Sequence, residues 1–412
     1  MLLNRFDLRL VPASIFLFVL PYTHTVALRL ISLLLAAIVA IQLSWRKPHA
    51  PLPCRLPLCL WIGICALSLS WSIAPTYSIG EFKNEVGYVM VAFLTFFYTT
   101  RNEAAWHLWR GIIVTSCVAI SLLAIVYIVP SGNWPMRSPF FQDRNMYSTY
   151  AVLVIPLFLL ILLQIGIKTF FGIFTAFAVL LALACGYLTI NRTFWPALVG
   201  EIVVFFCLAS NRSFTNIKSR IIGVLLLIVV CSIFVAGFIT VDYVKIGPSV
   251  TDSNAIEKSM EQSLRPQIWL YAAKRIAQRP MTGYGFGLGI LRKDFESRIG
   301  VQSAWHAHNV ILNSALETGI PGMILLLFLF AALVREFWRL YVTPRPEIWM
   351  IGTFGLTLLV GAALKSMTDN SIIREDALLF WSLIGMSLGY AGHKLAGITE
   401  SLPSPSIRKS RQ

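Results

Sequence analysis

WHAHNVILNSALETGIPGMILLLFLFAALVR, residues 305–335, sets two histidines and an asparagine directly ahead of a long apolar run. A helix needs about 20 mostly apolar residues to cross the hydrocarbon core of a bilayer, and the helix that we expect from His308 to Arg339 is longer than that. Because the surplus lies ahead of the apolar run, His308 is predicted at or above the lipid headgroups. Gly319 and Pro321 predict a break or kink between the two parts of this helix.

The composition of the whole chain is that of a membrane protein. Of its 412 residues 57% are hydrophobic and only 13% are charged, and the mean hydropathy is +0.72. No soluble domain needs that much apolar surface. We therefore predict an all-α integral membrane protein with about twelve transmembrane helices, near residues 10–22, 25–44, 56–73, 80–99, 107–129, 146–167, 169–189, 193–210, 220–241, 309–338, 347–367 and 374–392.

One long polar loop divides the chain. The prediction is nine transmembrane helices in residues 1–241, a periplasmic loop with amphipathic helices in 242–306, three further transmembrane helices in 307–392, and a cytoplasmic basic tail in 393–412. More than half of the 34 lysines and arginines then lie on the cytoplasmic side, as the positive-inside rule requires when both termini are cytoplasmic. This distribution accounts for the net charge of +15 without nucleic acid as a partner.

The unusual polar residues gather on the predicted periplasmic face. They lie in RSPFFQDRN (137–145), NRTFW (191–195), the loop 242–306 and KSMTDNSIIRED (365–376). Function is therefore predicted at the outer boundary between membrane and water. The seven cysteines all lie in or beside apolar spans and predict neither a disulfide framework nor a metal site.

The long loop contains two patterned segments. PQIWLYAAKRIAQ (266–278) places Trp269 and Ile276 on one face and has basic residues near its end, which predicts an amphipathic helix on the membrane surface or against the bundle. GYGFGLG (283–289) alternates glycine with apolar residues, but Leu288 stands where a dinucleotide motif needs its last glycine. We predict a turn whose backbone approaches another surface, and no nucleotide-binding fold.

Three residues on the predicted periplasmic face form a chemical set. Taken singly, Arg192 reads as a snorkelling anchor, Arg265 as a solvated loop charge and His308 as an interfacial helix cap. Taken together, they suit a phosphorylated lipid carrier, because the planar guanidinium fork matches phosphate oxygens and a neutral imidazole can accept a proton. His306, about 200° away round a helix, is predicted to be dispensable.

The carboxylates give weaker signals. Asp294 and Glu296 form a D-x-E pair that could hold a metal, although a solvated face is the plainer interpretation. Glu201 lies near the middle of a span, with no partner that the sequence identifies.

Several stretches resemble one family. HN at 308–309, followed after nine residues by GIPG at 319–322, resembles the H-[N/S/Q]-x9-G-x-x-G motif of O-antigen ligases and of bacterial protein O-oligosaccharyltransferases. RPQIWLYAAKRIAQRPMTGYGFG (265–287) resembles the Arg–Trp–Pro–Gly block of the O-antigen ligase/polymerase superfamily. NRTFWPAL (191–198) is similar to its arginine-bearing helix start, and FFQDRNMYSTYAVLVIP (140–156) to its asparagine-containing span entry.

The resemblance implies a membrane glycosyltransferase of GT-C-like architecture in the bacterial inner membrane. It would move the O-antigen glycan from undecaprenyl diphosphate to the lipid A–core oligosaccharide on the periplasmic face, among membrane lipids. The family's catalytic residues fall on His308, Arg265 and Arg192. The substrate-binding residues that we predict are Arg137, Asn145, Asn309, Gly319 and Gly322.

The first predicted periplasmic loop departs from many membrane glycosyltransferases. It reads Thr23-His24-Thr25 and lacks the D-x-D or E-x-D that holds a metal in those enzymes. We therefore expect no cofactor and a metal-independent transfer, in which the arginines neutralise charge and a single displacement inverts the anomeric configuration. Glu81, Glu85 and Asp369 stay open as carboxylates for a covalent route.

Three alternative functions are compatible with the sequence. An O-antigen polymerase would use the same donor with a second lipid-linked glycan as acceptor, and a protein O-oligosaccharyltransferase would share the histidine motif. A transporter of lipid-linked glycans would be expected to show internal repeats and charges along a path through the midplane. The sequence shows no such repeat, and its distinctive charges lie at one face.

Overall fold

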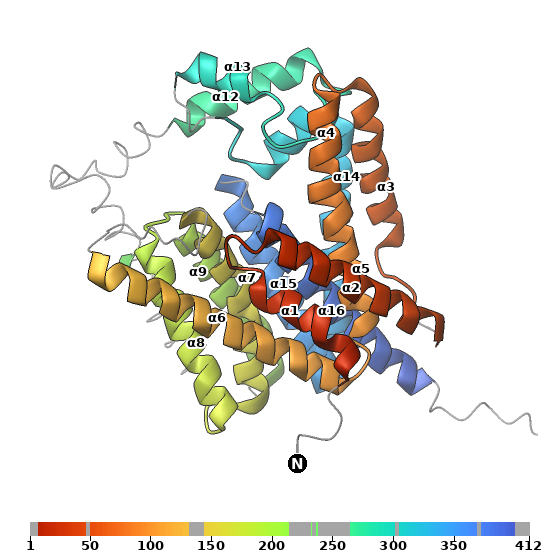
Figure 1. The fold of residues 1–412 in the computed structure, drawn as a ribbon, viewed down its shortest axis with the longest axis vertical. Helices are drawn as coiled ribbons and strands as arrows, with labels where there is room; N and C mark the ends of the chain where they lie inside the picture. Colours follow the sequence, from red (N-terminus) through yellow and green to blue (C-terminus); the bar gives the residue numbers. More distant parts are fainter. Residues whose placement is uncertain are drawn as a thin grey trace, which may run out of the picture.

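A computed structural model describes residues 7–46, 50–131, 144–213, 264–300, 305–368 and 372–399, with Ser232, Ala236 and Gly237. Within these ranges every regular secondary-structure element is a helix (Figure 1). The elements are η1 (Leu8–Leu10), α1 (Val11–Val19), α2 (Val26–Arg46), α3 (Arg55–Ser68), η2 (Leu69–Trp71), α4 (Pro75–Phe82), the π-helix η3 (Lys83–Gly87), α5 (Tyr88–Thr99), α6 (Glu103–Ser131), α7 (Arg144–Ile165), α8 (Phe170–Leu188), α9 (Phe194–Ser213), α12 (Arg265–Gln278), α13 (Arg292–Ile299), α14 (Val310–Val342), α15 (Pro346–Thr368) and α16 (Arg374–Thr399).

Seven of the described helices are long and apolar enough to cross a membrane. They are α2, α6, α7, α8, α9, α14 and α15, and two shorter apolar stretches cover Leu8–Val19 and Arg55–Trp71. Large apolar side chains such as Leu34 on α2 and Leu180 on α8 are 63% and 65% exposed, as expected of lipid-facing positions. The all-α, multi-pass part of the prediction is thus confirmed. Most of the span expected at 220–241 lies outside the described residues, and the spans expected at 80–99 and 374–392 are not among the seven. The total of twelve and the GT-C-like architecture therefore stay predictions.

The bundle is held by close helix approach at small residues. Helix α16 packs on α5, where a Cβ at Gly385 would lie 2.4 Å from the Phe93 carbonyl oxygen and one at Gly389 2.3 Å from that of Phe97. Such contacts suit helices in lipid, which associate by packing and not by a hydrophobic driving force. The indole of Trp381 adds an edge-to-face contact with Phe93, with ring centroids 5.5 Å apart.

Helix α14 is kinked where the sequence predicts it. Gly319 adopts φ 73° and ψ −179°, far from helical values. Two positions on, Pro321 has no N–H group, so the carbonyl of Glu317 could not find its usual partner four residues ahead in any case. The break therefore leaves backbone groups near Gly319 that need partners from elsewhere.

The segment at 280–285 supplies those partners. Three backbone hydrogen bonds join it to the kink: Ile320 N to Pro280 O at 2.7 Å, Tyr284 N to Leu316 O at 2.8 Å, and Gly285 N to Glu317 O at 2.9 Å. The kink and the glycine-rich segment, far apart in the sequence, thus form one structural unit.

The alternating glycines of 283–289 are explained by their backbone. Gly283, Gly285, Gly287 and Gly289 all have positive φ, from 64° to 136°. A Cβ at Gly283 would lie 2.6 Å from the Leu316 carbonyl oxygen. The predicted turn with close backbone approach is confirmed.

This segment also places α12 and α13. They lie at one end of the molecule, next to the ends of α3 and α4 (Figure 1). Trp71 Nε1 donates to the Thr282 carbonyl at 2.7 Å, and Ile73 N donates to the Tyr284 carbonyl at 3.0 Å.

Candidate active site

His308 lies two residues before the first residue of α14, in an uncommon backbone conformation. Asn309 is the N-cap of this helix, and its Oδ1 accepts from the backbone N–H groups of Ile311 and Leu312 at 3.0 and 3.1 Å. His308 itself has φ 48°, in the left-handed region that non-glycine residues seldom adopt. Strained conformations of this kind persist where the surroundings fix them, and they cluster at functional sites.

Contacts with neighbouring residues hold the histidine loop, residues 305–309, in this conformation. The His308 N–H donates to Nδ1 of His306 at 2.9 Å, and the two imidazole centroids are 3.9 Å apart. On the intervening residue, the Ala307 N–H donates to Asn313 Oδ1 and the Ala307 carbonyl accepts from Trp269 Nε1, both at 2.9 Å. The loop is therefore anchored on α14 and on α12.

The two histidines have different environments. His306 is 5% exposed and lies outside α14, so the helical separation of the two rings expected from the sequence does not apply. It packs against His308 and binds its backbone, whereas the His308 side chain is partly exposed. The assumed helical geometry is therefore wrong for His306, and the expectation that His306 tolerates alanine stays a prediction.

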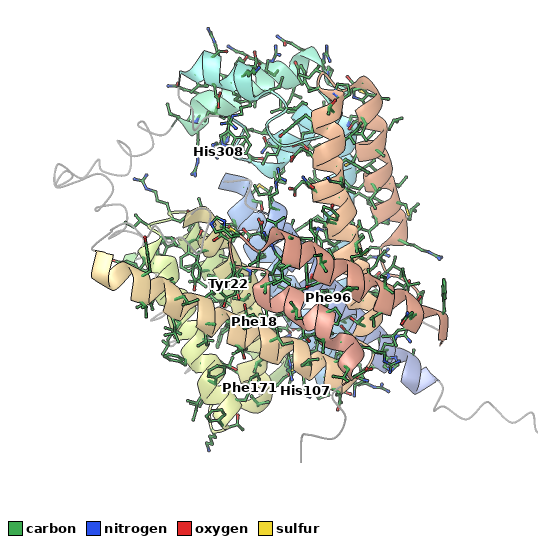
Figure 2. All side chains as sticks on the ribbon, viewed as in Figure 1. Phe18, Tyr22, Phe96, His107, Phe171 and His308 are labelled. Carbon is green, nitrogen blue, oxygen red and sulfur yellow. The ribbon has the colours of Figure 1, made fainter. Side chains whose placement is uncertain are left out.

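Arg265 lies on the same side of α12 as the anchor of the histidine loop. It is the first residue of α12, and Trp269 follows one helical turn later on the same face. Further along this face, Ile268 and Ala272 pack with Tyr284 in a small buried cluster, and Trp269 lies against the same cluster. The predicted amphipathic helix is confirmed, and it lies against the protein. Figure 2 shows His308 beneath α12, between the upper helices and the bundle.

Arg192 sits in a tight turn between α8 and α9. Ile190 has φ 51°, unusual for a β-branched residue. Asn191 organises the turn, since its Oδ1 accepts from the N–H and the hydroxyl of Thr193 at 3.0 and 2.8 Å. Its Nδ2 donates to Ser148 Oγ on α7 at 2.9 Å. Arg192 is half-buried and lies between Asn191 and Thr193, two members of this hydrogen-bond network.

The last turns of α15 join the Arg192 turn to the histidine loop. Lys365 Nζ donates to Ser148 Oγ at 3.0 Å and to Thr193 Oγ1 at 2.7 Å. Two residues on, the Met367 carbonyl accepts from Asn309 Nδ2 at 2.9 Å. The turn and the loop therefore meet at one end of the bundle, which we call the site end. It is where α7, α9 and α14 begin and α15 ends.

The remaining predicted binding residues have varied positions. The side chains of Arg137 and Asn145 lie outside the described part of the chain. A Cβ at Gly319 would lie 2.6 Å from Met281 backbone atoms, and one at Gly322 would meet the Thr318 side chain. Other parts of the protein therefore already occupy the space next to these two glycines. Contact of the glycines with substrate stays a prediction.

The D-x-E carboxylates are engaged in ion pairs. Asp294 binds Arg275 at 2.9 Å, and Glu296 binds Arg292 at 2.7 Å. Tyr271 donates its hydroxyl to Asp294 Oδ2 at 2.7 Å, and burial raises the pKa of Tyr271, which keeps the proton on the donor. In the described ranges, no three His, Cys, Asp or Glu side chains cluster as metal ligands would.

Two of the three carboxylates left open for a covalent route are also paired. Glu81 lies 2.7 Å and Glu85 3.3 Å from the guanidinium of Arg374 at the start of α16. Asp369 falls in an undescribed gap. Nearby, Arg29 binds Glu375 at 2.7 Å, with the guanidinium buried.

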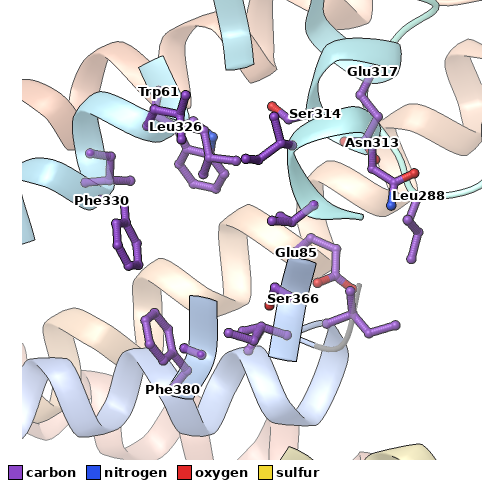
Figure 3. Close-up of a pocket in the computed structure, with 18 of the residues that line it drawn as sticks. Trp61, Glu85, Leu288, Asn313, Ser314, Glu317, Leu326, Phe330, Ser366 and Phe380 are labelled. Carbon is purple, nitrogen blue, oxygen red and sulfur yellow. The ribbon is translucent and has the colours of Figure 1, made fainter. Parts of the chain in front are cut away.

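A cavity of about 240 Å³ opens beside the start of α14. Its walls come from α3, α14, α15, α16 and the glycine-rich segment, and they are mostly apolar. Figure 3 shows Asn313 and Glu317 on one side of it and the rings of Phe330 and Phe380 on the other. The cavity therefore combines a polar edge near the histidine loop with an apolar interior.

Apolar helices of spanning length indicate a multi-pass membrane protein, and hydrogen bonds link the segments that carry Arg192, Arg265 and His308, which makes their surroundings a candidate group-transfer site. Residues 176–327 match the family model described as O-antigen ligase, which supports a place for the chain in the O-antigen ligase/polymerase superfamily. The match includes Arg192, Arg265 and His308, and it confirms the resemblance over about a third of the chain. Members of this family are membrane glycosyltransferase-type enzymes. No curated protein matches the chain.

Lys365 is one polar residue of the site end that sequence patterns do not single out. The stretch 365–376 stood out as polar, but nothing in it indicated a bond to a turn more than 170 residues earlier. One sequence signal could have pointed to Lys365: it follows an apolar stretch directly, with no break between them, which places a charged residue at the end of a membrane helix.

Proposed function

We propose that the protein is an O-antigen ligase, which transfers the glycan from undecaprenyl diphosphate to a hydroxyl of the lipid A–core oligosaccharide. The observation that carries the proposal is the convergence at the site end. The Arg192 turn, the start of α12 with Arg265, and the His308 loop come from three distant segments, and named hydrogen bonds tie all three together. All three segments lie within the matched family region.

The two arginines suit the diphosphate of such a donor. A guanidinium keeps its charge at any working pH and offers parallel N–H donors to phosphate oxygens. Arg192 and Arg265 bind the diphosphate and stabilise the charge that builds on it as the sugar–phosphate bond breaks. The ion pairs of Asp294 and Glu296, and the absence of D-x-D in the first loop, support charge neutralisation by arginine without a metal.

His308 serves as the general base in this proposal. The acceptor hydroxyl oxygen attacks the anomeric carbon, the bond from that carbon to the diphosphate oxygen breaks, and the imidazole takes the hydroxyl proton. Undecaprenyl diphosphate leaves, and one displacement inverts the anomeric configuration. General base catalysis of this kind contributes about 10²–10⁴ in rate.

The cavity beside α14 suits the lipid end of the donor. Its interior is lined by side chains such as Trp61, Leu326 and Phe330, and its edge reaches Val310, next to Asn309. An isoprenoid chain held there would keep its diphosphate near the histidine loop. This arrangement supports a lipid-linked donor over a soluble one.

The test is transfer by purified protein from an undecaprenyl-diphosphate-linked glycan, with three acceptors in separate reactions. We expect product with lipid A–core oligosaccharide. Product only with a second lipid-linked glycan would make the protein a polymerase, and product only with a peptide would make it a protein O-oligosaccharyltransferase. Movement of the lipid-linked glycan across a vesicle membrane, without transfer to any acceptor, would indicate a transporter.

A further inference from the structure

Lys365 is a fully buried lysine at the site end. Its side chain is 0% exposed, and its ammonium donates to the hydroxyls of Ser148 and Thr193. Burying an ammonium group costs several kcal/mol, so ionisable residues at membrane depth are retained where they serve a purpose. The proposed transfer chemistry assigns no step to this lysine.

The ammonium completes the network that shapes the Arg192 turn. Ser148 Oγ accepts from both Asn191 Nδ2 and Lys365 Nζ, at 2.9 and 3.0 Å. The Thr193 hydroxyl donates to Asn191 Oδ1 and accepts from Lys365 Nζ, at 2.8 and 2.7 Å. Because Ile190 holds a strained φ of 51°, the turn depends on such bonds to keep its shape.

The same stretch of α15 also reaches the histidine loop. Met367 lies two residues after Lys365, and its carbonyl accepts from Asn309, the neighbour of His308. A three-residue stretch of one helix therefore contacts both the arginine turn and the histidine loop. A rigid helix end in this position fixes the separation between the two.

We propose that Lys365 is a positioning residue for Arg192. It holds the 190–193 turn against the end of α15, so that the guanidinium meets the diphosphate at a fixed place relative to His308. The inference rests on the proposed function, in which Arg192 binds the donor. Lys365 itself does not touch substrate in this account.

The test is a double-mutant cycle read by binding of undecaprenyl diphosphate to protein in lipid nanodiscs. Lys365→Met keeps the length of the side chain and removes the charge-assisted hydrogen bonds. We expect roughly tenfold weaker binding, the loss typical of one hydrogen bond to a charged group. In an Arg192→Ala background Lys365→Met should have no further effect, whereas in an Arg265→Ala background it should keep its full effect.

Thr193 gives a second route to the same answer if Lys365→Met does not fold. Thr193→Val removes the hydroxyl that accepts from Lys365, and Thr193→Ser restores it, so only the valine variant should bind the diphosphate weakly. In Thr193→Val the acid limb of the pH–rate profile should stay unchanged, because His308 is not displaced.

The outcomes separate the two proposals. If Arg192→Ala leaves diphosphate binding intact, the proposed function fails at its donor site. If Arg192→Ala weakens binding but Lys365→Met either does nothing or adds its full effect to Arg192→Ala, the positioning role is overturned and the proposed function stands. A serine variant at 193 as weak as the valine variant also overturns it.

Discussion

Asn309 Nδ2 donates a hydrogen bond to the Met367 carbonyl at 2.9 Å, so the residue next to His308 is anchored on the last turn of α15. The same side chain caps α14 through its Oδ1. One asparagine thus performs two tasks with its two polar atoms, and substitution can separate them.

Asn309→Asp keeps the capping oxygen and removes the donor to Met367. Because a carboxylate is a good N-cap and suits the positive end of the helix dipole, we expect the variant to fold with nearly unchanged thermal stability. Turnover should nevertheless fall, since the histidine loop loses its tie to α15. Asn309→Ala removes both functions and should also lose about 1 kcal/mol of stability. Full turnover in Asn309→Asp would show that the Met367 bond does not position the loop.

Gly319→Ala should disrupt the kink of α14. The residue has φ 73°, and its Cβ would lie 2.6 Å from Met281 backbone atoms, so the 280–285 segment must move. We expect reduced thermal stability in detergent and loss of transfer. The matched control is Gly63→Ala, because Gly63 lies inside α3 with no atom within 4 Å of the added methyl group. Equal thermal stability and equal transfer activity in the two variants would contradict the role of the kink.

Transfer should survive excess EDTA. The carboxylates nearest to a metal motif, Asp294 and Glu296, are bound to Arg275 and Arg292. Asp294→Asn should therefore act on the packing of α12 against α13 and lower stability slightly, without creating a requirement for Mg²⁺ or Mn²⁺. Activity that disappears with EDTA and returns with either metal would reinstate these carboxylates as ligands.

The site end should face the periplasm. A cysteine at Ser297 on α13 should react with an impermeant thiol reagent in intact cells, and a cysteine at Glu347 should react only after the cells are opened. Both positions are exposed, and the exposed native thiols Cys59 and Cys207 are first replaced. Labelling of Glu347→Cys but not Ser297→Cys in intact cells would invert the topology.

Local sequence patterns predict the helices, the kink and the turns of this protein better than they predict the contacts between distant segments. The kink at Gly319, the helix at 265–278 and the close-approach turn at 283–289 each follow from the conformational limits of glycine and proline or from helical periodicity, which are properties of neighbouring residues. Arg192, Arg265 and His308 follow from the chemistry of their side chains, which suit a phosphorylated donor, and from the family resemblance.

The contacts between distant segments were not predictable in the same way. That residues 280–285 complete the hydrogen bonds of the kink, and that Lys365 binds Thr193, depends on how helices pack in three dimensions. A single sequence carries no record of such pairs. His306 shows the same limit, because helical periodicity predicts the two rings far apart, whereas the loop packs the His306 ring against that of His308.

In the proposed mechanism, His308 accepts a proton while the arginines hold the donor. The most direct measurement is undecaprenyl-diphosphate binding and turnover on the same purified variants. His308→Ala should lose turnover and keep donor binding, whereas Arg265→Lys keeps the charge but loses the planar fork and should impair both.

His306→Ala serves as the positioning control in that measurement. It removes the acceptor of the His308 N–H, so, against the sequence-based expectation, it should lower turnover while the acid limb of the pH–rate profile persists; in His308→Ala any residual activity should lack that limb. Loss of turnover with intact donor binding and no acid limb, in His308→Ala alone, is the predicted result. Loss of donor binding in His308→Ala as complete as in Arg265→Ala would make the imidazole a donor ligand or a structural cap, and would contradict the account.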